Sequence, residues 1–191
     1  SNKGLEAGAT QEHSHAQLLA TPIIPPQIQR EQDNMHYHFQ TKERCLICDI
    51  IHYEKQNKER LVAQNESFLA LIPYAAKSPF ALKIYPQEHI FDYTKLNFAQ
   101  IRDLAQILQT SFKKIKKALN DPPYNFLLKT VPNTYAQFTH DRWPNLEKSF
   151  HWYMEILPKL NYAGGMELAT DMDINPSSPE KCAGFLQQID I

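Results

Sequence analysis

The sequence lacks the features of membrane, secreted and nucleic-acid-binding proteins. No apolar stretch approaches the ~20 residues that a helix needs to cross a bilayer, and the first residues lack the basic and apolar regions of a signal peptide. The net charge is −1, so no broad basic field favours nucleic acid as a partner. The 3 cysteines include one C-x-x-C pair, which indicates metal or redox chemistry rather than a secreted disulfide scaffold. We therefore expect a cytoplasmic protein with no membrane and no nucleic acid as partner.

The 191 residues are enough to bury a hydrophobic core and suit one domain or a little more. Apolar residues recur at helical spacing over about residues 98–119, which predicts a long helix. The lysines near its end, between 113 and 117, are expected to form a solvated helix terminus rather than a phosphate-binding patch. Short apolar or alternating runs bounded by turn residues predict strands near 61–64, 68–73, 80–85, 124–130 and 150–157.

The most informative stretch is His13-Ser14-His15-Ala16-Gln17. On an extended strand, side chains two residues apart share a face, so His13, His15 and Gln17 would point the same way. This set suits phosphoryl chemistry, in which one histidine attacks phosphorus while the amide steadies the phosphate oxygens. Two such histidines alone are more often a zinc pair or ordinary polar surface. The preceding turn-rich segment, residues 2–10, adds backbone N–H groups that could approach a phosphate closely.

Three segments carry a resemblance to a known family: NKGLEAGATQEHSHAQLLATPIIPP, LNDPPYNFLLKT and FHWYMEILPKL. They resemble the galactose-1-phosphate uridylyltransferase family of the histidine-triad superfamily, and most of all its ADP-glucose phosphorylase-like members. The resemblance implies an α+β fold in which each half has an antiparallel sheet and packed helices. Residues 1–26 would be the C-terminal remnant of a first histidine-triad-like half, residues 27–42 a connecting segment that could be helical, and residues 43–191 a second half. A homodimer is expected on the same ground.

The resemblance also implies a mechanism and a set of substrates. Neutral His15 would attack the α-phosphorus of a nucleotide sugar, and a sugar 1-phosphate or phosphate would then accept the nucleotide. Gln17 would hydrogen-bond the α-phosphate, and Glu167 would contact hexose hydroxyls. Ordinary turn chemistry and a solvent-facing glutamate are the alternatives for Asn2, Thr10 and Glu167. The expected substrate-binding residues are Asn2, Gly8, Ala9, Thr10 and Glu167.

The pair Cys45 and Cys48 needs two further ligands if it binds zinc, because closed structural zinc sites are tetrahedral. The candidates from the residues alone are His52, His89, His140 and His151. By resemblance, the ligands of a structural zinc would be Cys45, Cys48, His89 and His151. Two reduced, buried cysteines are the alternative. His13 resembles the fourth ligand of another zinc site, whose remaining ligands would lie in the first half.

Residues 150–157 repeat the layout of the His13 motif and indicate an internal duplication. Phe150, Trp152, Met154 and Ile156 would face the core, with His151, Tyr153 and Glu155 on the opposite face. Tyr153 stands where the catalytic histidine would be, so the second half is expected to keep the fold and lose the nucleophile.

Three hypotheses follow from the sequence. The chain serves a hexose-1-phosphate nucleotidyltransferase, or a phosphorylase acting on ADP-glucose or a dinucleoside polyphosphate, or it is an inactive zinc- or nucleotide-binding remnant. Uridylyl and adenylyl transfer are not separated by the sequence.

Overall fold

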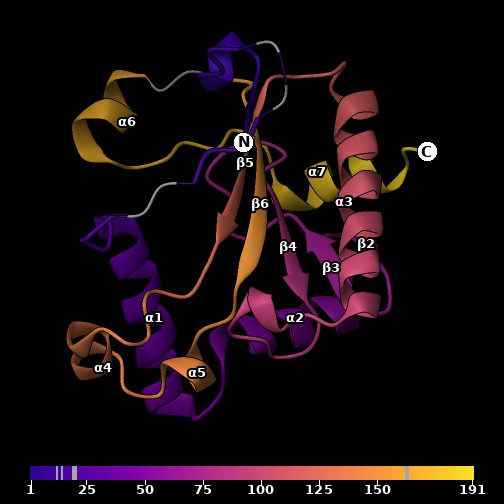
Figure 1. Cartoon of the computed structure of the whole chain (residues 1–191). Helices are drawn as coiled ribbons and strands as arrows, with labels where there is room; N and C mark the ends of the chain where they lie inside the picture. The colour runs from indigo at the N-terminus through magenta and orange to yellow at the C-terminus, as the bar shows by residue number, and fades with distance from the viewer. Residues whose placement is uncertain (12, 14, 19–20, 162–163) are drawn as a thin grey trace.

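An antiparallel sheet of six strands forms the centre of the chain, in the order β1-β5-β6-β4-β3-β2 (Figure 1). The structure is a computed structural model that describes every residue except 12, 14, 19–20 and 162–163. The strands are β1 Asn2–Lys3, β2 Leu61–Gln64, β3 Phe68–Leu71, β4 Leu82–Pro86, β5 Tyr124–Lys129 and β6 Tyr153–Pro158. The five strands predicted from the sequence are confirmed, with β6 beginning three residues later than expected.

Helices lie on both sides of this sheet. They are α1 Pro26–Lys42, α2 Leu46–Asn57, α3 Phe98–Ala118, α4 Gln137–Arg142, α5 Leu146–Ser149, α6 Gly165–Thr170 and α7 Pro179–Gln187, with 3₁₀ turns η1 Leu5–Ala7 and η2 Tyr93–Lys95. In Figure 1, α3 runs along one side of the sheet, and α1, α4 and α6 lie on the other. Among the described residues, none of these helices has the length and apolar character that a bilayer crossing requires. The predicted α+β architecture is confirmed.

The two faces of the sheet follow from strand register. Phe126 is opposite Ile156, and Phe126 packs against Phe112 of α3, so alternate residues of β5 and β6 face that helix. Leu127 and Lys129 are opposite Glu155 and Tyr153 and therefore belong to the other face. There the Tyr153 hydroxyl donates to Glu31 Oε2 of α1 at 2.9 Å. The predicted division of residues 153–156 between two faces is confirmed.

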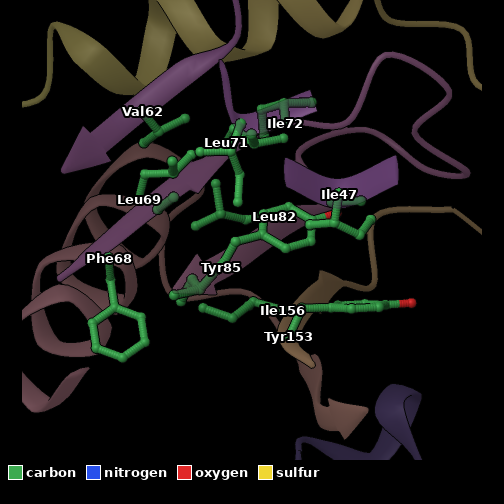
Figure 2. Close-up of a cluster of buried hydrophobic side chains, with 14 of the residues drawn as sticks. Ile47, Val62, Phe68, Leu69, Leu71, Ile72, Leu82, Tyr85, Tyr153 and Ile156 are labelled. Atoms are coloured by element: carbon green, nitrogen blue, oxygen red, sulfur yellow. The ribbon is translucent and has the colours of Figure 1, made fainter. Parts of the chain in front are cut away.

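The core lies between the sheet and the helices and is rich in aliphatic side chains (Figure 2). Phe68, Leu69 and Leu82 are fully buried, and Ile47 of α2 packs into the same cluster. Tyr85 and Tyr153 are also buried, because α1 covers the face on which Tyr153 lies. Their rings lie 5.4 Å apart.

Two expectations about local structure are wrong. The predicted strand at the His13 motif is not formed by residues 13 and 15–18. A strand needs a neighbour to accept and donate its backbone hydrogen bonds. The sheet ends on this side at the two-residue strand β1, and among the described residues no strand pairs with the His13 motif. Lys114 is not part of a solvated terminus: it is 9% exposed, and its Nζ donates to the carbonyls of Leu186, Gln187 and Ile189 at the end of α7.

The helical expectation for residues 27–42 is confirmed by α1. Pro26 opens this helix, where a missing N–H costs nothing. The division of the chain at residues 26 and 42 into a remnant, a connection and a second half stays a prediction.

Candidate metal centre and nucleophile segment

Four metal-ligating side chains meet at one end of the sheet. Cys45 is the N-cap of α2 and Cys48 lies in its first turn, while His89 follows β4 and His151 precedes β6. One ligand atom from each of the four lies within 4.8 Å of all the others. The fold therefore gathers the two cysteines and two histidines that the resemblance predicted as one ligand set.

The distances within this cluster fit a tetrahedral ion. Cys48 Sγ lies 3.4 Å from His89 Nδ1 and 3.5 Å from His151 Nδ1, and Cys45 Sγ lies 3.9 Å from His151 Nδ1. A tetrahedral zinc with Zn–S bonds of about 2.3 Å and Zn–N bonds of about 2.0 Å separates sulfur and nitrogen ligands by about 3.5 Å. The cluster needs only small movements to take a metal.

Backbone carbonyls fix the tautomer of both histidines. His89 Nε2 lies 2.9 Å from the Glu147 carbonyl, and His151 Nε2 lies 3.1 Å from the Pro86 carbonyl. A carbonyl oxygen only accepts, so each Nε2 carries the proton and each Nδ1 presents its lone pair to the cysteines. This is the second layer of contacts that orients histidine ligands in metal sites.

The electrostatics of the cluster favour a thiolate. A hydrogen bond from the Cys48 thiol lowers the pKa of the Cys45 thiol. Because Cys48 donates to Cys45, the pKa of the Cys48 thiol is raised. The contact with the Cys45 sulfur raises the pKa of His89. The N-terminus of α2, where Cys45 and Cys48 lie, adds a positive partial charge. Because thiolates bind metals, this environment suits a cation.

The other histidine candidates lie outside the cluster. His52 is exposed on α2, and its Nε2 lies 2.8 Å from Gln56 Nε2. His140 is exposed on α4. Within the described part of the chain, His13 belongs to no group of three or more ligating side chains, so its metal role stays a prediction.

One ring nitrogen of His15 lies within hydrogen-bond distance of the backbone, and the other has no partner among the described residues. Its Nδ1 lies 3.0 Å from the His13 carbonyl oxygen, so Nδ1 donates and the lone pair is on Nε2. The His15 side chain is half-buried, whereas Gln17 is exposed. A neutral imidazole with a free Nε2 is the form that a histidine nucleophile requires. Ser14, between the two histidines, lies outside the described residues.

The predicted phosphate-binding turn is ordered around η1. The Gly8 and Ala9 N–H groups donate within the turn to the carbonyls of Leu5 and Gly4. Gly4 and Gly8 have φ values of 83° and 78°, which favour glycine. Asn125 Nδ2 donates to Asn2 Oδ1 at 2.8 Å, so the Asn2 amide is held by β5. Thr10 is exposed, and the roles of these residues toward a substrate stay predictions.

Glu167 lies in the short helix α6, where its carboxylate accepts a hydrogen bond from the Gly164 N–H at 3.0 Å. Its side chain also lines a cavity on the sheet face under α6, together with Lys129 and Glu155. The sequence did not predict Lys129 or Glu31 at any site. The one signal in the sequence for a polar site on this face was Glu155, a charged residue in the otherwise largely apolar strand β6.

Fold and site define an α+β domain with a cluster of two cysteines and two histidines that could hold a metal ion. The chain belongs to the family described as galactose-1-phosphate uridyl transferase, C-terminal domain, whose model matches residues 30–157. The resemblance inferred from the sequence is confirmed.

Relatives match essentially the whole chain. ADP-glucose phosphorylase from Arabidopsis thaliana is 32% identical over 190 residues, covering 100% of this chain and 51% of the relative. Galactose-1-phosphate uridylyltransferase from Thermotoga maritima is 28% identical over 197 residues, covering 100% of this chain and 59% of the relative. The solved structure of ADP-glucose phosphorylase from Arabidopsis thaliana with bound ADP-glucose superposes with a TM-score of 0.87 at 30% identity, covering 100% of this chain and 58% of that one. The chain thus spans between half and three fifths of the length of these relatives.

Proposed function

We propose that the protein is a nucleotidyltransferase that exchanges a nucleoside monophosphate between a nucleotide sugar and a sugar 1-phosphate, through a nucleotidyl intermediate on His15. The observation that carries the proposal is the state of His15, whose Nδ1 donates to the backbone while Nε2 keeps its lone pair. Support comes from relatives named as uridylyltransferases and as a phosphorylase.

The proposed reaction has two balanced steps. His15 Nε2 attacks the α-phosphorus, an N–P bond forms, and the P–O bond to the sugar phosphate breaks, with the electron pair leaving on that oxygen. A phosphate oxygen of the acceptor then attacks the same phosphorus, and the N–P electron pair returns to His15. Gln17 donates its amide N–H groups to the α-phosphate oxygens, where charge grows in the transition state.

We propose that the metal held by Cys45, Cys48, His89 and His151 is zinc. Two thiolates and two imidazoles in a tetrahedral arrangement are a common structural zinc set. All four positions are filled by protein, so when bound the ion would supply folding free energy rather than a reactive water. No step of the reaction passes through it.

A second candidate is a phosphorylase that transfers adenylate from ADP-glucose to inorganic phosphate. Two observations favour it: Tyr153 replaces the histidine in the duplicated motif, and the 32% identical relative carries the name ADP-glucose phosphorylase. The chemistry at His15 is the same, with inorganic phosphate as the acceptor.

The test exposes the protein separately to ADP-glucose and UDP-glucose, each labelled at the α-phosphate. Acid-labile label retained from one donor identifies the base, and His15→Ala should retain none, whereas the exposed His52→Ala control should label normally. Adding phosphate or galactose 1-phosphate and identifying the product separates the two candidates. If neither donor leaves label, the proposal is wrong and a binding remnant is favoured.

A homodimer remains a prediction from the resemblance, and a cytoplasmic location remains a prediction from the composition of the sequence. Sedimentation equilibrium of the purified protein tests the first, and cell fractionation tests the second.

A further inference from the structure

The turn that precedes the His13 motif is anchored to the sheet by Asn125 of β5. Asn2 of β1 lies directly opposite Asn125 in the antiparallel pair, and Figure 1 shows the N-terminus beside β5. The Asn125 side chain is half-buried, and its Nδ2 donates to Asn2 Oδ1 and to the Ala7 carbonyl, each at 2.8 Å. Both N–H groups of this amide are therefore used to hold the N-terminal segment.

These two contacts fix the direction in which the Asn2 amide points. A backbone carbonyl only accepts hydrogen bonds, so the Asn125 atom beside the Ala7 carbonyl is the nitrogen. The same nitrogen faces Asn2, and Asn2 therefore presents its oxygen to Asn125. The Asn2 nitrogen is left on the other branch of the amide, where the described residues give it no hydrogen-bond partner.

The surroundings of the Asn2 nitrogen leave it available to a ligand. Gly8 has a φ of 78°, and apart from its chain neighbours only Asn2 Nδ2, among described residues, comes within 4 Å of the point where a Gly8 Cβ would lie, at 3.9 Å. The N–H groups of Ala7, Gly8 and Ala9 already donate to carbonyls within the turn. The Asn2 amide is therefore a donor that this turn keeps for a bound anion.

We propose that Asn125 is a positioning residue for nucleotidyl transfer at His15, an inference that rests on the proposed function. Asn125 acts through Asn2: by holding the Asn2 oxygen, it directs the Asn2 N–H groups toward the α-phosphate of the donor. Negative charge grows on the phosphate oxygens as His15 attacks, and a donor fixed in advance stabilises that charge most. The rate of transfer should therefore depend on Asn125 more strongly than the affinity for the donor does.

The test is a double-mutant cycle, read as the single-turnover rate at which α-phosphate label from the nucleotide sugar is retained on His15. Asn2→Ala and Asn125→Ala should each slow labelling at saturating donor by at least about tenfold, with little change in the half-saturating donor concentration. Once Asn2 is replaced by alanine, Asn125→Ala should slow labelling no further. The control Asn57→Ala removes an exposed amide that donates to the Tyr53 carbonyl, and it should label at the unaltered rate.

Asn2→Asp separates the direction of the amide from the stability of the turn. Its carboxylate still accepts from Asn125 but donates nothing to a phosphate. Labelling should therefore be at least as slow as in Asn2→Ala, while the urea unfolding midpoint stays close to that of the unaltered protein. Labelling of Asn2→Asp at the unaltered rate would show that the Asn2 nitrogen is not the donor, and the proposal would be wrong.

Two further results would overturn the proposal: labelling of Asn125→Ala at the unaltered rate, or a further slowing by Asn125→Ala in the Asn2→Ala background. The second is what a purely structural role gives, because independent effects multiply. In both cases the unaltered protein is labelled, so nucleotidyl transfer at His15 stands; if the unaltered protein retains no label, both proposals fail. Should Asn125→Ala not fold, Asn125→Asp replaces it, since a carboxylate only accepts and would turn the Asn2 nitrogen away from the phosphate. The same slowing is expected, and normal labelling contradicts the role.

Discussion

At the scale of single residues, the metal centre depends on histidines whose second ring nitrogen is already bound to the backbone. His151 is fully buried, and its Nε2 donates to the Pro86 carbonyl of β4. A change at this position therefore removes both a proposed metal ligand and a link between β4 and the segment before β6.

We predict that His151→Ala loses the bound metal and much of the free energy of unfolding. The unfolded chain has no preformed site, so the free energy of metal binding stabilises only the folded state. The measurement is metal content by mass spectrometry together with the thermal unfolding midpoint. His52→Ala is the matched control, since this exposed histidine lies on α2, four residues after Cys48. Undiminished metal in His151→Ala would remove that residue from the ligand set.

Tyr153 gives a pH-dependent prediction at the same scale. Burial, then the charge of Glu31, raises the pKa of Tyr153, and burial likewise raises the pKa of Tyr85. A raised folded pKa means that the stability contribution is complete below the unfolded value of about 10 and is lost as the pH rises above it. Each phenol should steepen the alkaline fall in unfolding free energy by about 1.4 kcal/mol per pH unit.

Two variants separate the titration of Tyr153 from its hydrogen bond. Tyr153→Phe and Tyr85→Phe should each make the alkaline fall shallower in urea unfolding series. Only Tyr153→Phe also loses the hydrogen bond to Glu31, so it alone should lower stability at neutral pH, by about 1–3 kcal/mol. An unchanged alkaline slope in both variants would contradict the pKa assignment.

At the scale of elements, local signals predicted the long helix and the strands well. Helix α3 begins where Asn97 and Gln100 form a capping box, and its apolar repeat is set by neighbours in the sequence. The short helix α4 was not predicted, because its position depends on a distant contact: Arg142 and Trp143, at its end, donate to Asp33 of α1. The candidate metal site shows the same contrast between local and distant information. The C-x-x-C spacing is visible in the local sequence, whereas the choice of His89 over His52 as a ligand came from the family resemblance.

Lys114 links α3 to α7, two helices that lie far apart in the sequence. Its ammonium satisfies three carbonyls at the end of α7, in place of solvent. We predict that Lys114→Met lowers unfolding stability by about 2 kcal/mol and increases amide exchange in α7. Exposed Lys113→Met is the control, and equal exchange in α7 for both variants would contradict this role.

At the scale of the whole molecule, the metal cluster joins α2 to the segments around β4 and β6, which are far apart in the chain. We predict that chelation lowers the thermal unfolding midpoint and that added zinc restores it. The ion stabilises the folded state because its four ligands link α2 to the segments after β4 and before β6. Calorimetric scans with and without chelator measure this. If the midpoint does not change while the metal is demonstrably removed, the ion has no structural role.

We propose that His15, and not a residue of the metal cluster or of the second motif, carries the nucleotide. The most direct measurement is peptide mapping by mass spectrometry after a short exposure to the donor nucleotide sugar, without acceptor and at neutral to alkaline pH. We expect a single nucleotidylated peptide with the modification on His15, which disappears when the acceptor is added. A nucleotide on any other residue, or product formed with no adduct in His15, would contradict it.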